Sequence, residues 1–231
     1  MDKITLKFNE IEIHPAGNDY VKLTVPKHRL PFFPAYFIIP DDVAPHFLIT
    51  AIRIGRDSQL ISPGAIPAEL FEESAPEIRL ILDQISDPER DELRVSATNI
   101  SDQKRLFTMQ VMGYVGSPGY ASPPVHILGY GFTSVPGNGA ANILVQPQRS
   151  FIPQSLFLPR ATRDNFRIES VKSSMMKTDT PLHDPNAQSR DRFIELSRQP
   201  SIEVRPFITI SVTNTSPAQK SFSAAIMGSL G

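Results

Sequence analysis

The chain has 231 residues, of which 40% are hydrophobic and 20% charged, and its formal net charge is −1. This composition supports packed cores and excludes a mostly disordered chain, and the scattered charges form no basic footprint for nucleic acid or an anionic membrane. The absence of cysteine excludes disulfides, thiolate nucleophiles and cysteine zinc sites.

Neither a signal peptide nor a membrane span is expected. The amino-terminal sequence MDKITLKFNE carries acidic residues and alternates like a strand. The most apolar run, Leu30 to Ile39, is ten residues long and is interrupted by Pro31 and Pro34. A helical span needs about 20 apolar residues, so this run is too short.

Short strands with alternating apolar residues are predicted along the first half of the chain. In chain order they lie within Met1–Pro15, Tyr20–Val25, Arg29–Pro40, His46–Gly55 and Glu77–Asp83. One helical turn is expected, over Ile66–Glu73, with Pro67 as its first residue. Prolines at the strand ends suit a backbone position that needs no donor. The strand spacing favours a two-sheet sandwich or jelly roll.

One stretch of the chain occurs twice. Leu93–Gly113 reads LRVSATNISDQKRLFTMQVMG, and 115 residues later Ile208–Gly228 reads ITISVTNTSPAQKSFSAAIMG. The alternation on both sides of the Asn-x-Ser turn predicts a β-hairpin that closes each half, with one buried face. The repeated residues assigned to this structural hairpin are Asn99, Ser101, Phe107 and Gly113 in the first copy and Asn214, Ser216, Phe222 and Gly228 in the second.

Weaker similarity extends the repeat towards the start of each half. Arg149–Ser174 matches the region from Leu30 to Gly55 at an offset of 119. Further upstream, Pro15, Leu23 and Pro26 fall on Pro136, Leu144 and Pro147 at an offset of 121. The copies diverge between Arg56–Glu92 and Met175–Phe207, which are expected to be loops that carry specificity.

The duplication predicts an all-β protein made of two tandem, internally duplicated β-sandwiches of jelly-roll type, with few short helices. The first sandwich is expected over Met1–Gly116 and the second over Val125–Gly231. The proline- and glycine-containing segment Ser117–Pro124 is the expected linker between them.

No catalytic, cofactor-binding or metal-binding residue is predicted. The histidines, His14, His28, His46, His126 and His183, lack the spacing of a metal cluster, and the pair His183–Asp184 is assigned to a polar turn. The acidic groups Asp41, Asp42, Asp87, Glu89, Asp91 and Glu92 could hold calcium, but the glycine-bearing spacing of a calcium loop is missing, so they are assigned to solvated turns and calcium binding is left open. Serine lacks a Gly-x-Ser-x-Gly context, so an enzyme is not expected.

The Asn-x-Ser triplets at Asn99 and Asn214 formally match glycosylation acceptors. The same triplets are good turn chemistry, since the Asn side chain bonds to the backbone two residues on. We therefore assign them to turns.

The tandem, roughly equal β-sandwiches with short loops resemble the double jelly-roll major capsid proteins of tailless bacteriophages that contain an internal membrane. The resemblance covers the whole chain at the level of architecture and matches no specific motif. It implies trimers that pack as pseudo-hexamers, with one end of each subunit facing an internal lipid membrane.

The function expected on this basis is that of a major capsid protein, which self-assembles through homotrimers into an icosahedral shell. The expected location is the virion, with other virion proteins as partners, no cofactor and no sequence-specific nucleic acid binding. Two alternatives stay open at this point: a tandem binding module for a carbohydrate or a receptor, and a minor or decoration virion protein.

Overall fold

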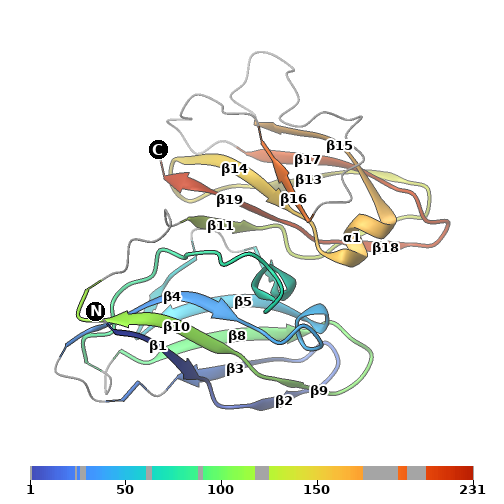
Figure 1. The fold of residues 1–231 in the computed structure, drawn as a ribbon. Helices are drawn as coiled ribbons and strands as arrows, with labels where there is room; N and C mark the ends of the chain where they lie inside the picture. Colours follow the sequence, from blue (N-terminus) through green and yellow to red (C-terminus); the bar gives the residue numbers. More distant parts are fainter. Residues whose placement is uncertain are drawn as a thin grey trace. The chain divides into compact units, whose positions relative to one another are not determined.

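A computed structural model describes residues 2–23, 25–26, 30–60, 64–87, 91–117, 125–173, 192–196 and 207–230 (Figure 1). The chain forms two compact units. Unit 1 comprises Met1–Leu60 and Pro67–Val125, and unit 2 comprises Ile61–Ile66 and His126–Gly231. The predicted linker lies outside the described residues except for Ser117.

Unit 1 is built from short strands and two 3₁₀ turns. They are β1 (Asp2–Lys7), β2 (Ile11–Ile13), β3 (Asn18–Leu23), β4 (Phe32–Ile38), η1 (Ala44–His46), β5 (Phe47–Ile54), β6 (Asp57–Ser58), η2 (Ala68–Phe71), β8 (Leu93–Asn99), β9 (Arg105–Phe107) and β10 (Gln110–Val115). The two-residue strand β7 (Ile66–Pro67) lies where the chain passes from unit 2 back to unit 1.

The strand order of unit 1 is that of a jelly roll. One sheet has the order β1-β10-β4, and the opposing sheet has the order β3-β8-β5-β6, with every pair antiparallel. A further segment pairs with the free side of β4, because Ile85 bridges Phe32 and the Leu80 amide donates to the Ala35 carbonyl at 2.8 Å. Counted along the chain, the eight segments of these two sheets are β1, β3, β4, β5, β6, the segment that contains Leu80 and Ile85, β8 and β10. They form sheets of order 1-8-3-6 and 2-7-4-5, the arrangement of two interlocked Greek keys.

Unit 2 repeats this arrangement. Its elements are β11 (His126–Gly129), β12 (Thr133–Val135), β13 (Ala140–Val145), β14 (Phe151–Phe157), α1 (Arg160–Asn165), β15 (Phe166–Ser173), β16 (Phe193–Glu195), β17 (Ile208–Asn214), β18 (Lys220–Phe222) and β19 (Ala225–Leu230). Its sheets have the orders β11-β19-β14-β16 and β13-β17-β15, which correspond to 1-8-3-6 and 2-7-4. The all-β double sandwich predicted from the duplication is confirmed.

Each unit has its own apolar core between its two sheets. In unit 1, Phe47 and Phe107 are buried with ring centroids 4.8 Å apart. In unit 2, the corresponding Phe166 and Phe222 meet edge to face at 5.4 Å. Burying a phenylalanine side chain contributes about 1.5–3 kcal/mol, so these pairs anchor the strands that carry them.

The repeated stretch is not a hairpin, which corrects the prediction. β8 pairs with β3 and β5, whereas β9 pairs with β2, and β10 pairs with β1 and β4. The chain therefore crosses from one sheet to the opposing one after Asn99. Both sheets face the same core, so alternation locates a strand without identifying its partner.

The upstream alignment at an offset of 121 is also wrong, and the structural offset is 122. Leu23 pairs with Leu93, and the residue that pairs with the equivalent Ile208 is Val145. Leu23 is 2% exposed and Val145 8%, whereas Leu144 is 57% exposed. The identical letters at 23 and 144 thus occupy opposite faces of their strands, as a one-residue register shift requires.

The helical turn expected over Ile66–Glu73 is present as η2, with Pro67 immediately before it. The helix α1 was not predicted. It begins after Pro159 and buries only Thr162, so it has no apolar periodicity by which a sequence pattern reveals a helix.

Candidate assembly surfaces

Asn99 holds together two turns at one end of unit 1. Its side chain is fully buried, and Nδ2 donates to the carbonyls of Ile13 and Gln103, both at 2.8 Å. Its Oδ1 accepts from the Ser101 amide at 2.9 Å and from the Ser101 hydroxyl at 2.8 Å. Every polar atom of the amide is thereby satisfied inside the protein, as burial requires.

Asn214 makes the equivalent contacts in unit 2. Its Nδ2 donates to the carbonyls of Val135, Pro136 and Ala218 at 3.0 ± 0.1 Å, and its Oδ1 accepts from the Ser216 amide at 2.9 Å. Asn214 is also fully buried. Both asparagines are thus engaged as turn residues, and neither amide is accessible to a glycosylating enzyme in the folded protein.

Gly113 and Gly228 sit where two strands approach closely. A Cβ at Gly113 would lie 2.3 Å from the carbonyl oxygen of Phe33, and one at Gly228 would lie 2.1 Å from that of Ile152. Both contacts occur beside a break in the strand register, between Met112 and Gly113 in unit 1. Only glycine fits such a contact without movement of the backbone.

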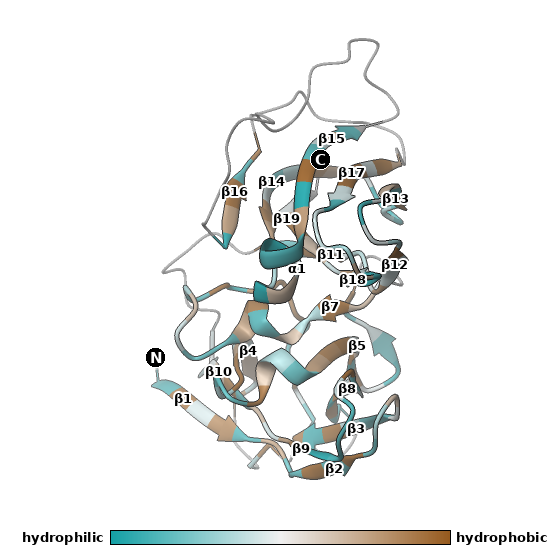
Figure 2. Cartoon of the chain, turned by 90° about the vertical axis from the view of Figure 1, so that its right-hand side faces the viewer, coloured by the Kyte–Doolittle hydropathy of each residue, from teal (hydrophilic) through white to brown (hydrophobic). Residues whose placement is uncertain are grey.

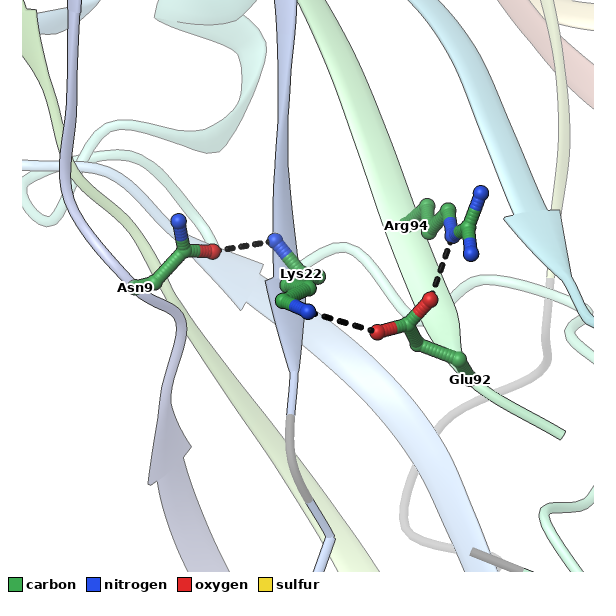
Figure 3. A network of polar contacts seen from close by, with 4 residues as sticks. All are labelled: Asn9, Lys22, Glu92 and Arg94. Atoms are coloured by element: carbon green, nitrogen blue, oxygen red, sulfur yellow. Dashed lines mark hydrogen bonds and ion pairs between the residues drawn. The ribbon is translucent and has the colours of Figure 1, made fainter. Parts of the chain in front are cut away.

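A polar network covers the edge of unit 1 at β3 (Figure 3). The side-chain oxygen Oδ1 of Asn9 accepts from the backbone amide of Lys22 at 2.5 Å. The backbone amide of Asn9 donates to the carbonyl of Lys22 at 3.1 Å. The ammonium group of Lys22 lies 3.6 Å from Glu92, which also accepts from Arg94 at 2.5 Å. Arg94 in turn lies over the Tyr20 ring, 5.3 Å from its centroid.

At the same place in unit 2, apolar residues stand where unit 1 has its Lys22–Glu92 ion pair. At the structural offsets, Leu144 replaces Lys22 and Phe207 replaces Glu92. Leu144 is 57% exposed and Phe207 44% exposed. A diagonal ion pair on the solvent face of one sheet has therefore become a diagonal pair of exposed apolar side chains on the other.

A hollow opens beside these apolar residues within unit 2. It has a volume of about 720 Å³ and is lined by the consecutive residues Leu144–Arg149 together with Gly64, Gly129 and Tyr130. The Tyr130 hydroxyl donates to the Ile208 carbonyl at 3.3 Å, and burial raises the pKa of this phenol well above its usual value. Tyr130 therefore lines the hollow with a hydrogen-bonded, uncharged side chain.

The described histidines differ in exposure. His14 is exposed, whereas His46 and His126 are partly buried, which lowers the pKa of both imidazoles. His28, His183 and Asp184 lie outside the described residues. Within the described parts of the chain, no three histidine, aspartate or glutamate side chains gather as metal ligands.

Two of the described acidic residues accept hydrogen bonds from backbone amides. Asp41 accepts from the Ser74 amide at 3.0 Å, and Asp91 accepts from the amides of Ser86 and Asp87 at 3.3 and 3.1 Å. Glu92 belongs to the network over β3. Glu89 lies outside the described residues.

Among the described helices, none is long and apolar enough to cross a membrane. The interval Met175–Phe207, expected to carry specificity, is described only at residues 192–196 and 207.

The surface at Leu144 and Phe207 was missed by the sequence reasoning. The identity of Leu144 with the buried Leu23 predicts a core position for it, and Phe207 ends an interval in which the two copies diverge. No local signal in the sequence gives the correct offset, which brings together Ala16 and Asn138, two residues with a positive φ of 55° and 52° in the structure.

No protein-family model matches the chain, and no curated protein does. Among solved structures, the chain is similar to the crystal structure of the major capsid protein P2 from bacteriophage PM2. The match covers 98% of this chain and 96% of that one, with 10% sequence identity and a TM-score of 0.41.

Proposed function

We propose that this protein is the major capsid protein of a virus, a structural subunit that assembles through homotrimers into an icosahedral shell. The observation that carries the proposal is the pair of jelly rolls in one chain, with the same strand order in both units. The jelly roll is a recurrent architecture of viral capsid domains. A trimer of such a chain presents six similar lobes, which suits a lattice of near-hexagonal contacts.

In this proposal each lobe is one of the two predicted domains, Met1–Gly116 and Val125–Gly231, joined by Ser117–Pro124. The eight repeated residues have a structural role in the two lobes; they are Asn99, Ser101, Phe107, Gly113, Asn214, Ser216, Phe222 and Gly228. Their supporting contacts point inwards: the asparagines bond to buried carbonyls, and the phenylalanines lie in the cores. Assembly contacts then fall to the solvent faces, where the two units differ. The protein is expected in the virion, beside other virion proteins and an internal membrane.

The jelly roll also occurs in lectin and cupin domains, so the fold alone does not decide the function. One observation favours a binding module as the second candidate, namely the hollow along Leu144–Arg149, whose volume lies in the range of small-molecule pockets. A binding module predicts that a ligand raises the melting temperature. A shell subunit predicts oligomers without any ligand.

The test is the mass of the purified full chain in solution, measured by light scattering over a wide concentration range, with negative-stain microscopy of the same samples. A stable trimer or closed particles are expected. A chain that stays strictly monomeric at high concentration would contradict the proposal. A decoration protein would bind preformed shells without forming particles alone.

A further inference from the structure

Among the described elements of unit 2, β13 has a partner strand on one side alone. β13 is the terminal strand of the sheet β13-β17-β15 (Figure 2). The Asn214 amide donates to the Gly139 carbonyl at 2.8 Å, which fixes the hydrogen-bonding register of the two strands. Because bonded and non-bonded pairs alternate along an antiparallel ladder, Ala141, Ile143 and Val145 bond to β17. Ala140, Asn142 and Leu144 therefore direct their amides and carbonyls away from the sheet.

Unit 1 shows how such an edge is closed. Lys22, the counterpart of Leu144, has both its outward amide and its outward carbonyl bonded to Asn9. The counterpart of Asn9 in unit 2 is Gly131, which has no side chain to accept from Leu144, and its amide donates instead to the Ala65 carbonyl at 3.0 Å. Among the residues that the structure describes, no group bonds to the outward backbone of Leu144.

The edge of unit 2 also lacks the charges that usually protect an edge strand. β3 reads NDYVKL and carries Asp19 and Lys22, whereas β13 reads AANILV and carries no charge. Leu144 and Phe207 add exposed apolar surface next to the open backbone groups. An edge with these properties is a template for another extended strand.

We propose that β13 pairs edge to edge with β13 of a second copy of this chain, across a twofold axis. The uncharged strand meets its own copy without repulsion, and an isologous antiparallel contact satisfies the outward groups of both edges at once. Leu144 and Phe207 of the two copies then shield the new hydrogen bonds. The inference rests on the proposed self-assembly, in which it supplies the contact between neighbouring trimers, because a trimer's own threefold contacts cannot be isologous.

The absence of cysteine allows a direct test with single-cysteine variants of the full chain. In the pairings that overlap most of this six-residue strand, Asn142 faces Asn142 or Leu144 of the other copy. Bonded antiparallel partners have Cα atoms about 5.5 Å apart, within the range of a disulfide. We expect a covalent dimer on mild oxidation of Asn142→Cys in the first pairing, and of an equal mixture of Asn142→Cys and Leu144→Cys in the second. Leu144→Cys alone is the third sample, which detects a pairing shifted further along the strand.

The matched control is Leu106→Cys, because Leu106 is 46% exposed and lies on β9 of unit 1. It should give no more covalent dimer than random collision produces. If none of the three β13 samples exceeds this control while the wild-type chain still assembles, the edge pairing is overturned and the proposed function stands. Trapping by a disulfide also detects a weak dimer, so the test decides even where the wild-type chain is monomeric.

A second variant measures the contribution to association. Leu144→Lys installs on β13 the residue that stands at the equivalent position of β3, and Leu106→Lys makes the same chemical change elsewhere. Sedimentation analysis should show that Leu144→Lys weakens self-association about tenfold or more, with the melting temperature unchanged, because the added ammonium group lies at the shared strand edge, where lysine protects edge strands from pairing. Equal association of the two lysine variants would overturn the inference, as would a β13 edge that captures a different protein while copies of this chain leave it free.

Discussion

Replacement of Asn99 by alanine tests whether the repeated asparagine is a structural staple. The change removes the Nδ2 bonds to the carbonyls of Ile13 and Gln103 and the Oδ1 bond to the Ser101 amide. The methyl group of alanine cannot reach any of these partners. The Ile13 carbonyl loses its partner in a buried place, where water does not replace it freely.

The expected loss follows from the number of bonds. A buried hydrogen bond contributes a net 0.5–1.5 kcal/mol or so, and an unsatisfied buried carbonyl adds about 1–3 kcal/mol. Three backbone bonds therefore predict that Asn99→Ala lowers the free energy of unfolding of unit 1 by about 2–4 kcal/mol. Asn99→Asp should cost at least as much at neutral pH, because a carboxylate oxygen then faces two carbonyls, and the cost should shrink in acid as the carboxyl group is protonated.

The assay is urea unfolding followed by circular dichroism, with amide hydrogen exchange used to separate the stability of the two units. The control is Asn18→Ala, since the single described partner of this exposed amide is the Thr50 hydroxyl, at 3.3 Å. It should change stability by less than about 0.5 kcal/mol. The structural role of Asn99 would be refuted if Asn99→Ala lowered the free energy of unfolding by less than about 1 kcal/mol, or if the loss for Asn99→Asp did not depend on pH.

Three further outcomes are expected. Phe107→Ala should destabilise unit 1 by about 3–5 kcal/mol in the same urea assay, because the ring is fully buried, and a change below about 1 kcal/mol would contradict that burial. Gly228→Ala should lower the melting temperature, since its Cβ would meet the Ile152 carbonyl oxygen at 2.1 Å, and an unchanged melting temperature would show that the strands separate easily. Burial and the charge of Arg149 hold the pKa of His126 below its ordinary value of 6.5. The folded state therefore binds this proton less readily than the unfolded state, and the free energy of unfolding falls as the pH drops below 6.5 towards the folded-state pKa. Arg149→Gln should raise the pKa of His126 in an NMR titration, and a fixed or lower pKa would exclude the charge effect.

The fold could be predicted from the sequence because burial repeats every second residue along a strand. Val95 and Phe107 belong to such patterns, and both are buried in the core of unit 1. The partner of each strand could not be predicted in the same way. β8 and β10 are separated in the chain by the short strand β9 and share one core, yet they lie in opposing sheets. Their alternation would be the same in a hairpin.

The exposed surface at Leu144 could not be predicted from the sequence because a leucine also stands at position 23, one residue away from the true equivalent. Leu23 and Leu144 match in letter, and a one-residue error in offset then assigns an exposed side chain to the core. The hydrogen bonds of the asparagine turns decide the register, because the Ile13 and Val135 carbonyls accept from Asn99 and Asn214 respectively. Such bonds join residues far apart in the chain, and no local pattern encodes them.

The difference between the two edges bears on association more than on folding. Substitutions at solvent-exposed positions usually change stability by less than about 0.5 kcal/mol, so a lysine and a leucine are almost interchangeable for the fold of a jelly roll. Buried positions have no such freedom, which fits the equivalent contacts of Asn99 and Asn214 in the two units. A duplicated chain can therefore hold two copies of one scaffold and give them different edges. Asn9 closes one edge at Lys22, and no described residue bonds to the outward backbone of Leu144 at the other, so the proposed pairing of copies uses a difference that the fold itself does not constrain.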